Sequence, residues 1–302
     1  MLLLQQMIVM FIYMLIGYVV CRKGMLDSCA SDRISWIVIN IANPALAISA
    51  VVNGEGKIEG KSLLLTVGLS AAIFAVLIIL AQIMPYVFRI RKEEISIYKA
   101  MTSFNNIGFM GYPVIAAAYG TEALLYAAIF SMMFNILIYT YGIYIISESG
   151  VKGIQWRRIA NIGVLSCVIA IILYLTDLPV PQVIKTVAAG LSGLTGPLSM
   201  MVIGMSLVGI PMRKMFSDMQ MILYSLVKLI VVPIIGMVVI NSFVDNEMLC
   251  GVCMIMLATP AASMNVMLAQ QYGKNQEVAA RGVALTTLLS VVTIPLVSAV
   301  VF

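Results

Sequence analysis

Residues 103–108 read Ser-Phe-Asn-Asn-Ile-Gly, and residues 258–265 read Ala-Thr-Pro-Ala-Ala-Ser-Met-Asn. Each stretch interrupts a long apolar run with polar, Gly or Pro residues. Asn106 and Thr259 occupy the middle of these stretches and lie 259 − 106 = 153 positions apart. Interrupted apolar segments at matching places in two halves of a chain are the best sequence indication of a solute-binding site inside a membrane.

The composition supports a membrane location. Of 302 residues, 62% are hydrophobic and 10% are charged, whereas a soluble domain has about 25% charged residues. A crossing helix needs about 20 apolar residues. On that basis we expect an all-α integral membrane protein that contacts the bilayer and no nucleic acid. Ten spans are predicted, at 2–20, 33–52, 62–88, 95–118, 121–147, 159–176, 182–210, 217–241, 247–270 and 275–302.

The distribution of Lys and Arg predicts the orientation. With the N-terminus outside, 14 of the 18 basic residues fall in inside loops and 3 in outside loops, which leaves Lys228 within a span. The positive-inside rule therefore predicts a multi-pass protein of the cell membrane with both termini outside.

Two halves, residues 1–150 and 151–302, are predicted to form a five-plus-five repeat. The 153-residue offset places Asn43-Pro44 on Gly196-Pro197, and it also places Tyr119-Gly120 on Tyr272-Gly273. Because each half has an odd number of spans, the second half enters the membrane inverted. Such repeats build their substrate sites near the midplane of the bilayer.

The two interruptions favour an anion. Pro260 removes a backbone donor, and glycines weaken the helix in the fourth span. A break leaves a half-helix whose N-terminal N–H groups and positive dipole end attract negative charge. The predicted break residues are Gly108, Gly111, Pro113 and Pro260. The predicted ligands for a carboxylate are Asn105, Asn106, Thr259, Ser263 and Asn265.

Lys228 lies in the middle of the eighth span, where a charge is costly and by default marks a functional site. It would complement an anionic substrate, titrate during a transport cycle, or occupy the place of a coupling cation. The structural alternative is a cation bound by backbone carbonyls at the breaks. All 13 Asp and Glu residues lie in loops or near span ends, so an inorganic cation is disfavoured as the main substrate.

The sequence favours a carrier over a channel and over an intramembrane enzyme. A channel would show a ring of charges or carbonyls, which this sequence lacks. An intramembrane enzyme would depend on Ser263 and Lys228, and we expect no enzymatic activity. No cofactor or metal site is predicted.

Asn43, Pro44 and Pro197 are predicted to break the second and seventh spans. Gly190, Gly193 and Gly196 recur every three residues, a pattern that allows close helix approach. We expect this face to serve packing or a homodimer contact through these two spans, and the alternative is that it lines the substrate path.

The motifs resemble the auxin efflux carrier (PIN-like) family and its bacterial members. The similar pieces are Asn43-Pro44-Ala45, Asn106 followed by Gly111-Tyr112-Pro113 and Tyr119-Gly120, and Pro260 through Gln270-Gln271-Tyr272-Gly273. The resemblance implies a fold like that of bile-acid symporters, in which spans 4 and 9 cross at their breaks. It also implies an elevator motion of a transport domain (spans 3–5 and 8–10) against a scaffold (spans 1, 2, 6 and 7), and a scaffold-mediated dimer.

The same resemblance places Asn106 where plant carriers have a substrate-binding Asn. Two departures are evident: Asn105 stands where plant carriers often have Pro, and only 148–158 replaces their long cytoplasmic loop. Bacterial relatives are linked to malate, malonate and similar carboxylates. We therefore expect secondary transport of a small carboxylate of this kind, or of an auxin-like acid.

Overall fold

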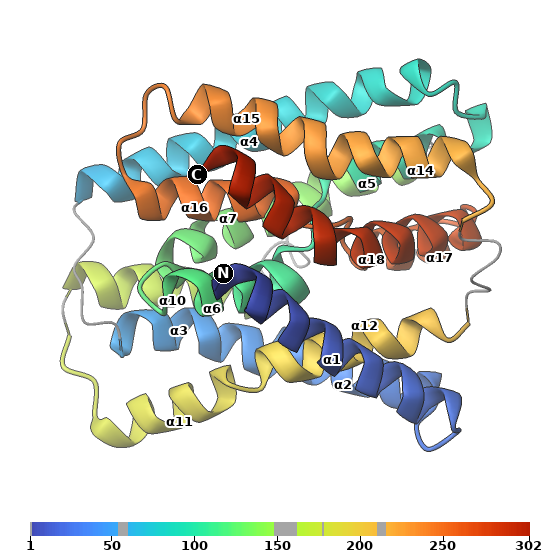
Figure 1. Ribbon diagram of the computed structural model, residues 1–302. Helices are drawn as coiled ribbons and strands as arrows, with labels where there is room; N and C mark the ends of the chain where they lie inside the picture. The colour runs from blue at the N-terminus through green and yellow to red at the C-terminus, as the bar shows by residue number, and fades with distance from the viewer. Residues whose placement is uncertain (1, 54–59, 148–161, 177, 210–215) are drawn as a thin grey trace. The chain divides into compact units, whose positions relative to one another are not determined.

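The computed structural model describes residues 2–53, 60–147, 162–176, 178–209 and 216–302, and every regular element in these ranges is a helix (Figure 1). Seven of the helices are long and apolar enough to cross a membrane. These are Leu4–Arg22, Cys29–Val52, Gly60–Val87, Leu124–Ser147, Gln182–Leu207, Met219–Ile240 and Gln276–Val301. Shorter apolar helices cover Ile107–Tyr119, Ile162–Thr176 and Glu247–Ala258. The expected all-α membrane class is confirmed.

The chain divides into two compact units, each made of three segments. The first unit comprises Met1–Val67, Ile107–Met133 and Ala160–Gly209. The second comprises Gly68–Asn106, Phe134–Ile159 and Ile210–Phe302. The boundary between Asn106 and Ile107 falls at the break of the fourth span, so the two halves of that span belong to different units.

In the first unit, α1 (Leu2–Arg22) packs along α12 (Thr195–Leu207), as the blue and yellow helices of Figure 1 show. Their backbones come together at one glycine of each helix, each of which faces the backbone of a methionine of the other helix. A Cβ built on Gly17 would lie 2.1 Å from the Met201 carbonyl oxygen, and one on Gly204 would lie 1.9 Å from that of Met14. Small residues permit this approach between membrane helices.

Elsewhere in this unit, α3 (Asn43–Val52) packs against α10 (Ile162–Thr176) and α11 (Gln182–Ser192). The glycine face predicted on α11 is less closely packed than the α1–α12 contact. A Cβ on Gly190 would meet nothing within 4 Å, and one on Gly196 would make ordinary contacts at 3.6 Å with Met10 and Pro113.

In the second unit, α18 (Gln276–Val301) is the central helix. It contacts α5 (Ile95–Ser103), α16 (Glu247–Ala258), α17 (Met264–Gln271) and the kinked span made of α14 (Met219–Leu226), η5 (Val227–Val231) and α15 (Val232–Ile240). The unit also holds most of α4 (Gly60–Val87), and η4 (Ile138–Gly142) with α8 (Ile143–Ser147).

The fourth and ninth spans are both interrupted, but of the predicted break residues only Pro260 lies in an interruption, whereas Gly108, Gly111 and Pro113 lie in the helical turns that follow the break of the fourth span. In the fourth, α5 ends at Ser103 and the helix resumes at Ile107 with the π-helical turn η3 (Ile107–Gly111), followed by α6 (Tyr112–Tyr119). In the ninth, α16 ends at Ala258 and α17 begins at Met264. The residues that end α5 and α16, Phe104 and Thr259, have extended backbones. Without an i−4 bond at these points, the backbone groups need other partners.

The second span is not broken at Asn43-Pro44, so that prediction is wrong. The helix continues from α2 (Ser28–Ile37) through the π turn η1 (Val38–Ala42) into α3, where Pro44 occupies the first turn. A proline cannot donate to the carbonyl four residues earlier and clashes with it, and a widened π turn absorbs both defects. In the seventh span, a two-residue turn at Gly193 and Leu194 precedes α12, so the interruption lies just before Pro197.

Several helix ends recur at the predicted offset. Helix α4 ends at Val87 and α15 at Ile240, where 240 − 87 = 153. Gly120 and Gly273, again 153 apart, both have positive φ, at 80° and 66°. A left-handed residue after a helix is a standard termination that favours glycine. The inversion of one half relative to the other stays a prediction.

Candidate functional site

The two breaks are joined to each other by backbone hydrogen bonds. Asn105 and Ala261 form an isolated antiparallel bridge. The Asn106 N–H donates to the Pro260 carbonyl at 2.7 Å, and the Ala262 N–H donates to the Phe104 carbonyl at 2.9 Å. This short pairing satisfies groups that the interrupted helices leave free, which is required wherever irregular backbone lies at membrane depth.

The Asn105 side chain closes the end of α16. Its Nδ2 donates to the carbonyls of Met256 at 2.7 Å and Leu257 at 3.2 Å, which belong to the last turn of α16. The Thr259 hydroxyl donates to the same Met256 carbonyl at 3.1 Å. The last carbonyls of a helix have no partner within it, so Asn105 and Thr259 act as the C-terminal cap of this half-helix.

Lys228 is hydrogen-bonded to the oxygen of the Asn105 side-chain amide. Its Nζ donates a hydrogen bond to Asn105 Oδ1, and the side chain is only 2% exposed. Asn105 thus connects a buried ammonium with the carbonyl end of α16, where the helix dipole favours a cation. An ammonium has three donor positions, and Asn105 takes one of them.

The local backbone explains how Lys228 is placed. It lies in η5, a π-helical turn between α14 and α15, and Pro233 follows in the first turn of α15. As in the second span, proline removes a donor and crowds the preceding turn. The resulting π turn is a feature that is frequent at functional sites.

The charge at this place is not balanced by a buried acid. Among the described residues, Lys228 is the one charged side chain that is buried, and no described Asp or Glu is. A buried ion without a counter-charge is costly in a membrane. The described part of the chain thus supplies no carboxylate to offset the charge of Lys228.

Asn105 and Asn106 have different environments although both are buried. Successive side chains of extended backbone point to opposite faces. The Asn105 side chain is directed to α16 and Lys228, so from this alternation we expect the Asn106 side chain on the other face of the bridge. Asn105 therefore has its amide committed to protein groups, and the choice of Asn106 as the substrate ligand stays a prediction.

Asn265 lies in the first turn of α17 and is 1% exposed. Its Nδ2 donates to the Phe104 carbonyl at 3.2 Å, whereas its Oδ1 has no hydrogen-bond partner. Ser263, the residue before α17, accepts through its carbonyl from the amides of Val266 and Met267. Thus the amide donors of Asn105 and Asn265, which we expected to bind a carboxylate, are occupied by backbone carbonyls in this conformation.

The remaining predicted break residues lie in the first unit. Gly108 and Gly111 belong to η3, and Pro113 lies in the first turn of α6. A Cβ on Gly108 would lie 3.1 Å from Asn43 Nδ2, so the absence of a side chain there lets the Asn43 amide approach η3. This contact links two of the motifs that the sequence singled out.

Thr286 is a site residue that the sequence did not indicate. The Ala261 N–H donates to its Oγ1 at 3.2 Å, and the hydroxyl itself donates to the Gly282 carbonyl at 2.8 Å. Thr286 is fully buried on α18. A hydroxyl in an apolar helix is the available signal, but Thr287 beside it gives the same signal and instead bonds to its own helix.

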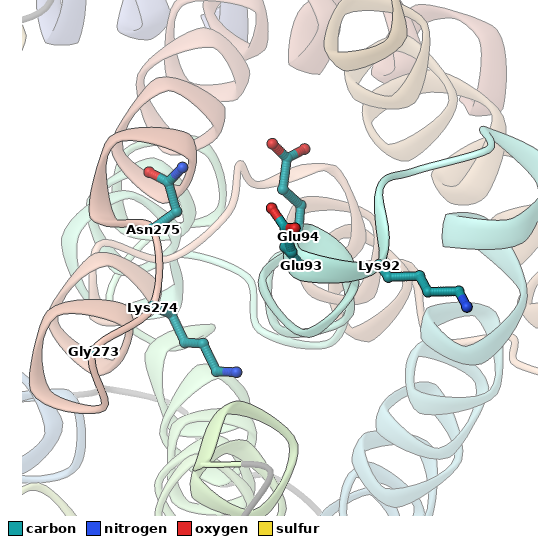
Figure 2. A pocket seen from close by; sticks show the side chains of 6 residues that line it. All are labelled: Lys92, Glu93, Glu94, Gly273, Lys274 and Asn275. Atoms are coloured by element: carbon teal, nitrogen blue, oxygen red, sulfur yellow. The ribbon is translucent and has the colours of Figure 1, made fainter.

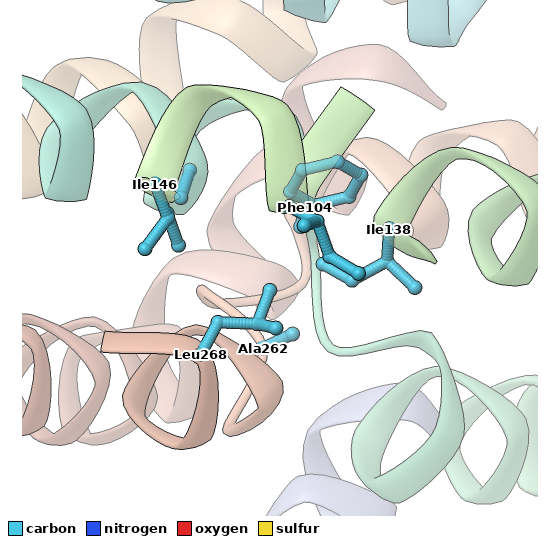
Figure 3. Packing of buried hydrophobic residues seen from close by; sticks show 7 residues of the cluster. Phe104, Ile138, Ile146, Ala262 and Leu268 are labelled. Carbon is cyan, nitrogen blue, oxygen red and sulfur yellow. The ribbon is translucent and has the colours of Figure 1, made fainter. Parts of the chain in front are cut away.

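An apolar cluster packs around the bridge. Phe104 and Ala262, which flank the paired residues, contact Ile138 and Ile146 of the fifth span and Leu268 of α17 (Figure 3). Close packing of this kind keeps water from the backbone groups of the break and holds its geometry.

A hollow of about 420 Å³ lies away from the breaks, between the turn before α5 and the turn after α17 (Figure 2). Its lining residues are Lys92, Glu93, Glu94, Gly273, Lys274 and Asn275. None of the predicted substrate ligands lines this hollow.

Discontinuous helices with a buried cation at their meeting point are typical of α-helical secondary transporters. The family model described as "Membrane transport protein" matches residues 2–298. The chain belongs to this family, which is the auxin efflux carrier (PIN-like) family that its motifs resemble.

Two archaeal relatives match nearly the full length. An uncharacterized transporter of Methanothermobacter thermautotrophicus is 23% identical over 298 residues, covering 96% of this chain and 95% of the relative. An uncharacterized transporter of Methanocaldococcus jannaschii is 24% identical over 298 residues, covering 96% of each chain. The family and both relatives point to transport rather than to an enzyme.

Proposed function

We propose that this protein is a secondary transporter of a small organic anion, such as malate, malonate or an auxin-like acid, that works by elevator-type alternating access. It would act in the cell membrane with both termini outside, as the distribution of Lys and Arg suggests. The substrate carboxylate would bind at the meeting point of the broken fourth and ninth spans.

The observation that carries this proposal is the buried Lys228. Its ammonium lies at the end of α16, bound to Asn105, and no described acidic side chain is buried with it. A carboxylate would supply the missing negative charge and use donor positions of the ammonium that Asn105 leaves. Asn106 and Ser263 belong to the same two breaks and are the proposed neighbouring ligands, and Thr259 would join them only if its hydroxyl left the Met256 carbonyl.

The closed state of the site supports alternating access over a pore. Asn105, Asn106 and Asn265 are each at most 2% exposed, and Thr259 is fully buried. A substrate can reach them only if the protein opens. Two separately compact units are also what a rigid-body motion requires. The alternatives are an anion channel and, with less support, an intramembrane enzyme based on Ser263 and Lys228.

Uptake of labelled malate and malonate into proteoliposomes tests the proposal. Saturable uptake that is accelerated by unlabelled acid inside the vesicles is expected of a carrier, whereas single-channel current without such counterflow would indicate a channel. Breakdown of the acid during the assay would indicate an enzyme.

A matched pair of variants tests the role of Lys228. Lys228→Met removes the buried charge, and we expect it to lower uptake at least about tenfold, because a charge-assisted bond contributes about 1.5–3 kcal/mol. Lys99→Gln is the control, since Lys99 donates to Gln82 Oε1 at 2.6 Å in an exposed pair of the same unit. Equal uptake by both variants would contradict the proposed site.

A further inference from the structure

The orientation of the Asn265 amide is fixed by its partner. Nδ2 donates to the Phe104 carbonyl at 3.2 Å, and a carbonyl can only accept. The same carbonyl also accepts from the Ala262 N–H at 2.9 Å. Rotating the amide by half a turn would bring Oδ1 against this oxygen and remove the bond. The bond to Phe104 therefore fixes the Asn265 amide with Nδ2 on the Phe104 carbonyl and leaves Oδ1 as the atom that can bind another group.

That oxygen is a buried acceptor without a donor. Asn265 is 1% exposed, and Oδ1 has no hydrogen-bond partner among the described residues. A buried acceptor normally finds a partner, and leaving one unpaired destabilises the protein. Its position in the first turn of α17, two residues after the ninth span's break, puts it in the region where the substrate is proposed to bind.

We infer that Asn265 Oδ1 accepts a hydrogen bond from the substrate, so that the transported anion carries a donor in addition to its carboxylate. This inference rests on the proposed transport function and narrows its substrate class. Hydroxy acids satisfy the requirement through their hydroxyl group, and indole acids satisfy it through their ring N–H. Unsubstituted acids such as malonate, succinate and propionate do not, so of the acids proposed above the inference retains malate and auxin-like acids and disfavours malonate.

The expected selectivity follows from the cost of an unpaired acceptor. A substrate without a donor would leave Oδ1 unsatisfied in the occupied site, as in the empty one, whereas a hydroxy acid would pair it. Sites that hydrogen-bond a substrate hydroxyl discriminate strongly against the analogue that lacks it. We expect malate to be preferred over succinate, and lactate over propionate, by at least about tenfold in the inhibition constant, which corresponds to 1.4 kcal/mol.

The experiment measures inhibition constants of malate and succinate, and of lactate and propionate, on the wild-type protein in proteoliposomes. These pairs differ by a single hydroxyl group, so the result does not depend on any variant folding. A preference of at least about tenfold for the hydroxy acids supports the inference. Equal constants within each pair would overturn it while leaving organic-anion transport intact. If no acid is transported or inhibits, the proposed function itself fails.

Two variants then assign the preference to a residue. Asn265→Leu, of similar volume but without polar atoms, is expected to bring the malate and succinate constants to within about twofold of each other. Thr293→Val is the control, because Thr293 Oγ1 is another buried, unpaired polar atom of the same unit. Its ratio should equal that of the wild type. A preference that survives in Asn265→Leu would overturn the assignment to Asn265.

Discussion

Lys228 and Asn105 are 123 residues apart in the chain, yet their side chains share a buried hydrogen bond. Through this bond a cation of the eighth span is connected to the break of the fourth, and through the Asn105 Nδ2 to the last turn of α16 in the ninth. Three spans thus depend on one amide. Its loss should affect folding as well as transport.

Replacing Asn105 by Leu leaves the Lys228 ammonium and the α16 carbonyls without this partner. We expect the free energy of unfolding to fall by about 1.5–3 kcal/mol, the typical contribution of a hydrogen bond to a charged group. Adding Lys228→Met should restore part of the loss, because the unpaired charge is then gone. Thermal unfolding of the wild type, both single variants and the double variant in detergent measures this coupling. Additive losses would contradict it.

Thr286→Val should weaken the ninth span's break. The substitution keeps the shape of the side chain but removes the oxygen that accepts from the Ala261 N–H, and an unpaired buried donor costs about 1–3 kcal/mol. Thr287→Val is a matched control on the same helix, because Thr287 bonds only to the Val283 carbonyl of α18 in the described contacts. Thermal unfolding should separate the two variants. Equal melting temperatures would show that Thr286 does not support the bridge.

Asn106→Ala tests the ligand that the family resemblance favours. If its amide contacts the substrate, KM for uptake should rise at least about tenfold, whereas the amount of folded protein should change little. The control is Asn241→Ala at the exposed end of α15. Unchanged KM and maximal rate in Asn106→Ala would show that the substrate binds elsewhere.

Gly204→Ala should destabilise the first unit. The added Cβ would lie 1.9 Å from the Met14 carbonyl oxygen, a backbone atom that no rotamer change can move. Overpacking typically costs about 1–3 kcal/mol. Gly68→Ala, in a helix where a Cβ meets nothing within 4 Å, should be neutral or slightly stabilising. A comparison of melting temperatures in detergent checks both expectations.

Cys29 reports the orientation. It is free and exposed in the first turn of α2, directly after the connection from the first span, which we expect to face the cytoplasm. A membrane-impermeant maleimide should label it only after the cells are permeabilised, and Cys29→Ser should abolish that labelling. A cysteine placed at exposed Asn53, in the Cys29→Ser background, should react in intact cells. The reverse pattern would show that the N-terminus is inside.

The sequence predicted which two apolar runs are interrupted, because Gly, Pro and Asn have a direct backbone consequence, but in the fourth span the break precedes Gly108, Gly111 and Pro113. It also singled out Lys228, since a charge at that depth stands out in any apolar span. It failed at Asn43-Pro44, where the same residue types produced a π turn within a continuous helix. A proline indicates where a helix is disturbed, but whether the helix breaks or forms a wider π turn depends on the surrounding packing.

The connections within the site were beyond the reach of the sequence. Neither the Asn105–Lys228 bond nor the Thr286–Ala261 bond follows from spacing, because each joins different helices through side-chain directions that only the packed structure sets. The roles of the two neighbouring asparagines depend on the extended backbone of the bridge. The glycine contacts of Gly17 and Gly204 were likewise hidden, because the two residues lie in separate spans without a repeating motif.

The contact between α1 and α12 has a mechanical consequence. At Gly17 and Gly204 no side chain separates the two backbones, so neither helix can slide along the other or turn about its own axis without atoms overlapping. At these points the two backbones are not separated by flexible side chains, which could otherwise adjust their rotamers as the helices moved. Whatever part of this protein travels during a transport cycle, α1 and α12 are interlocked and keep their places beside each other.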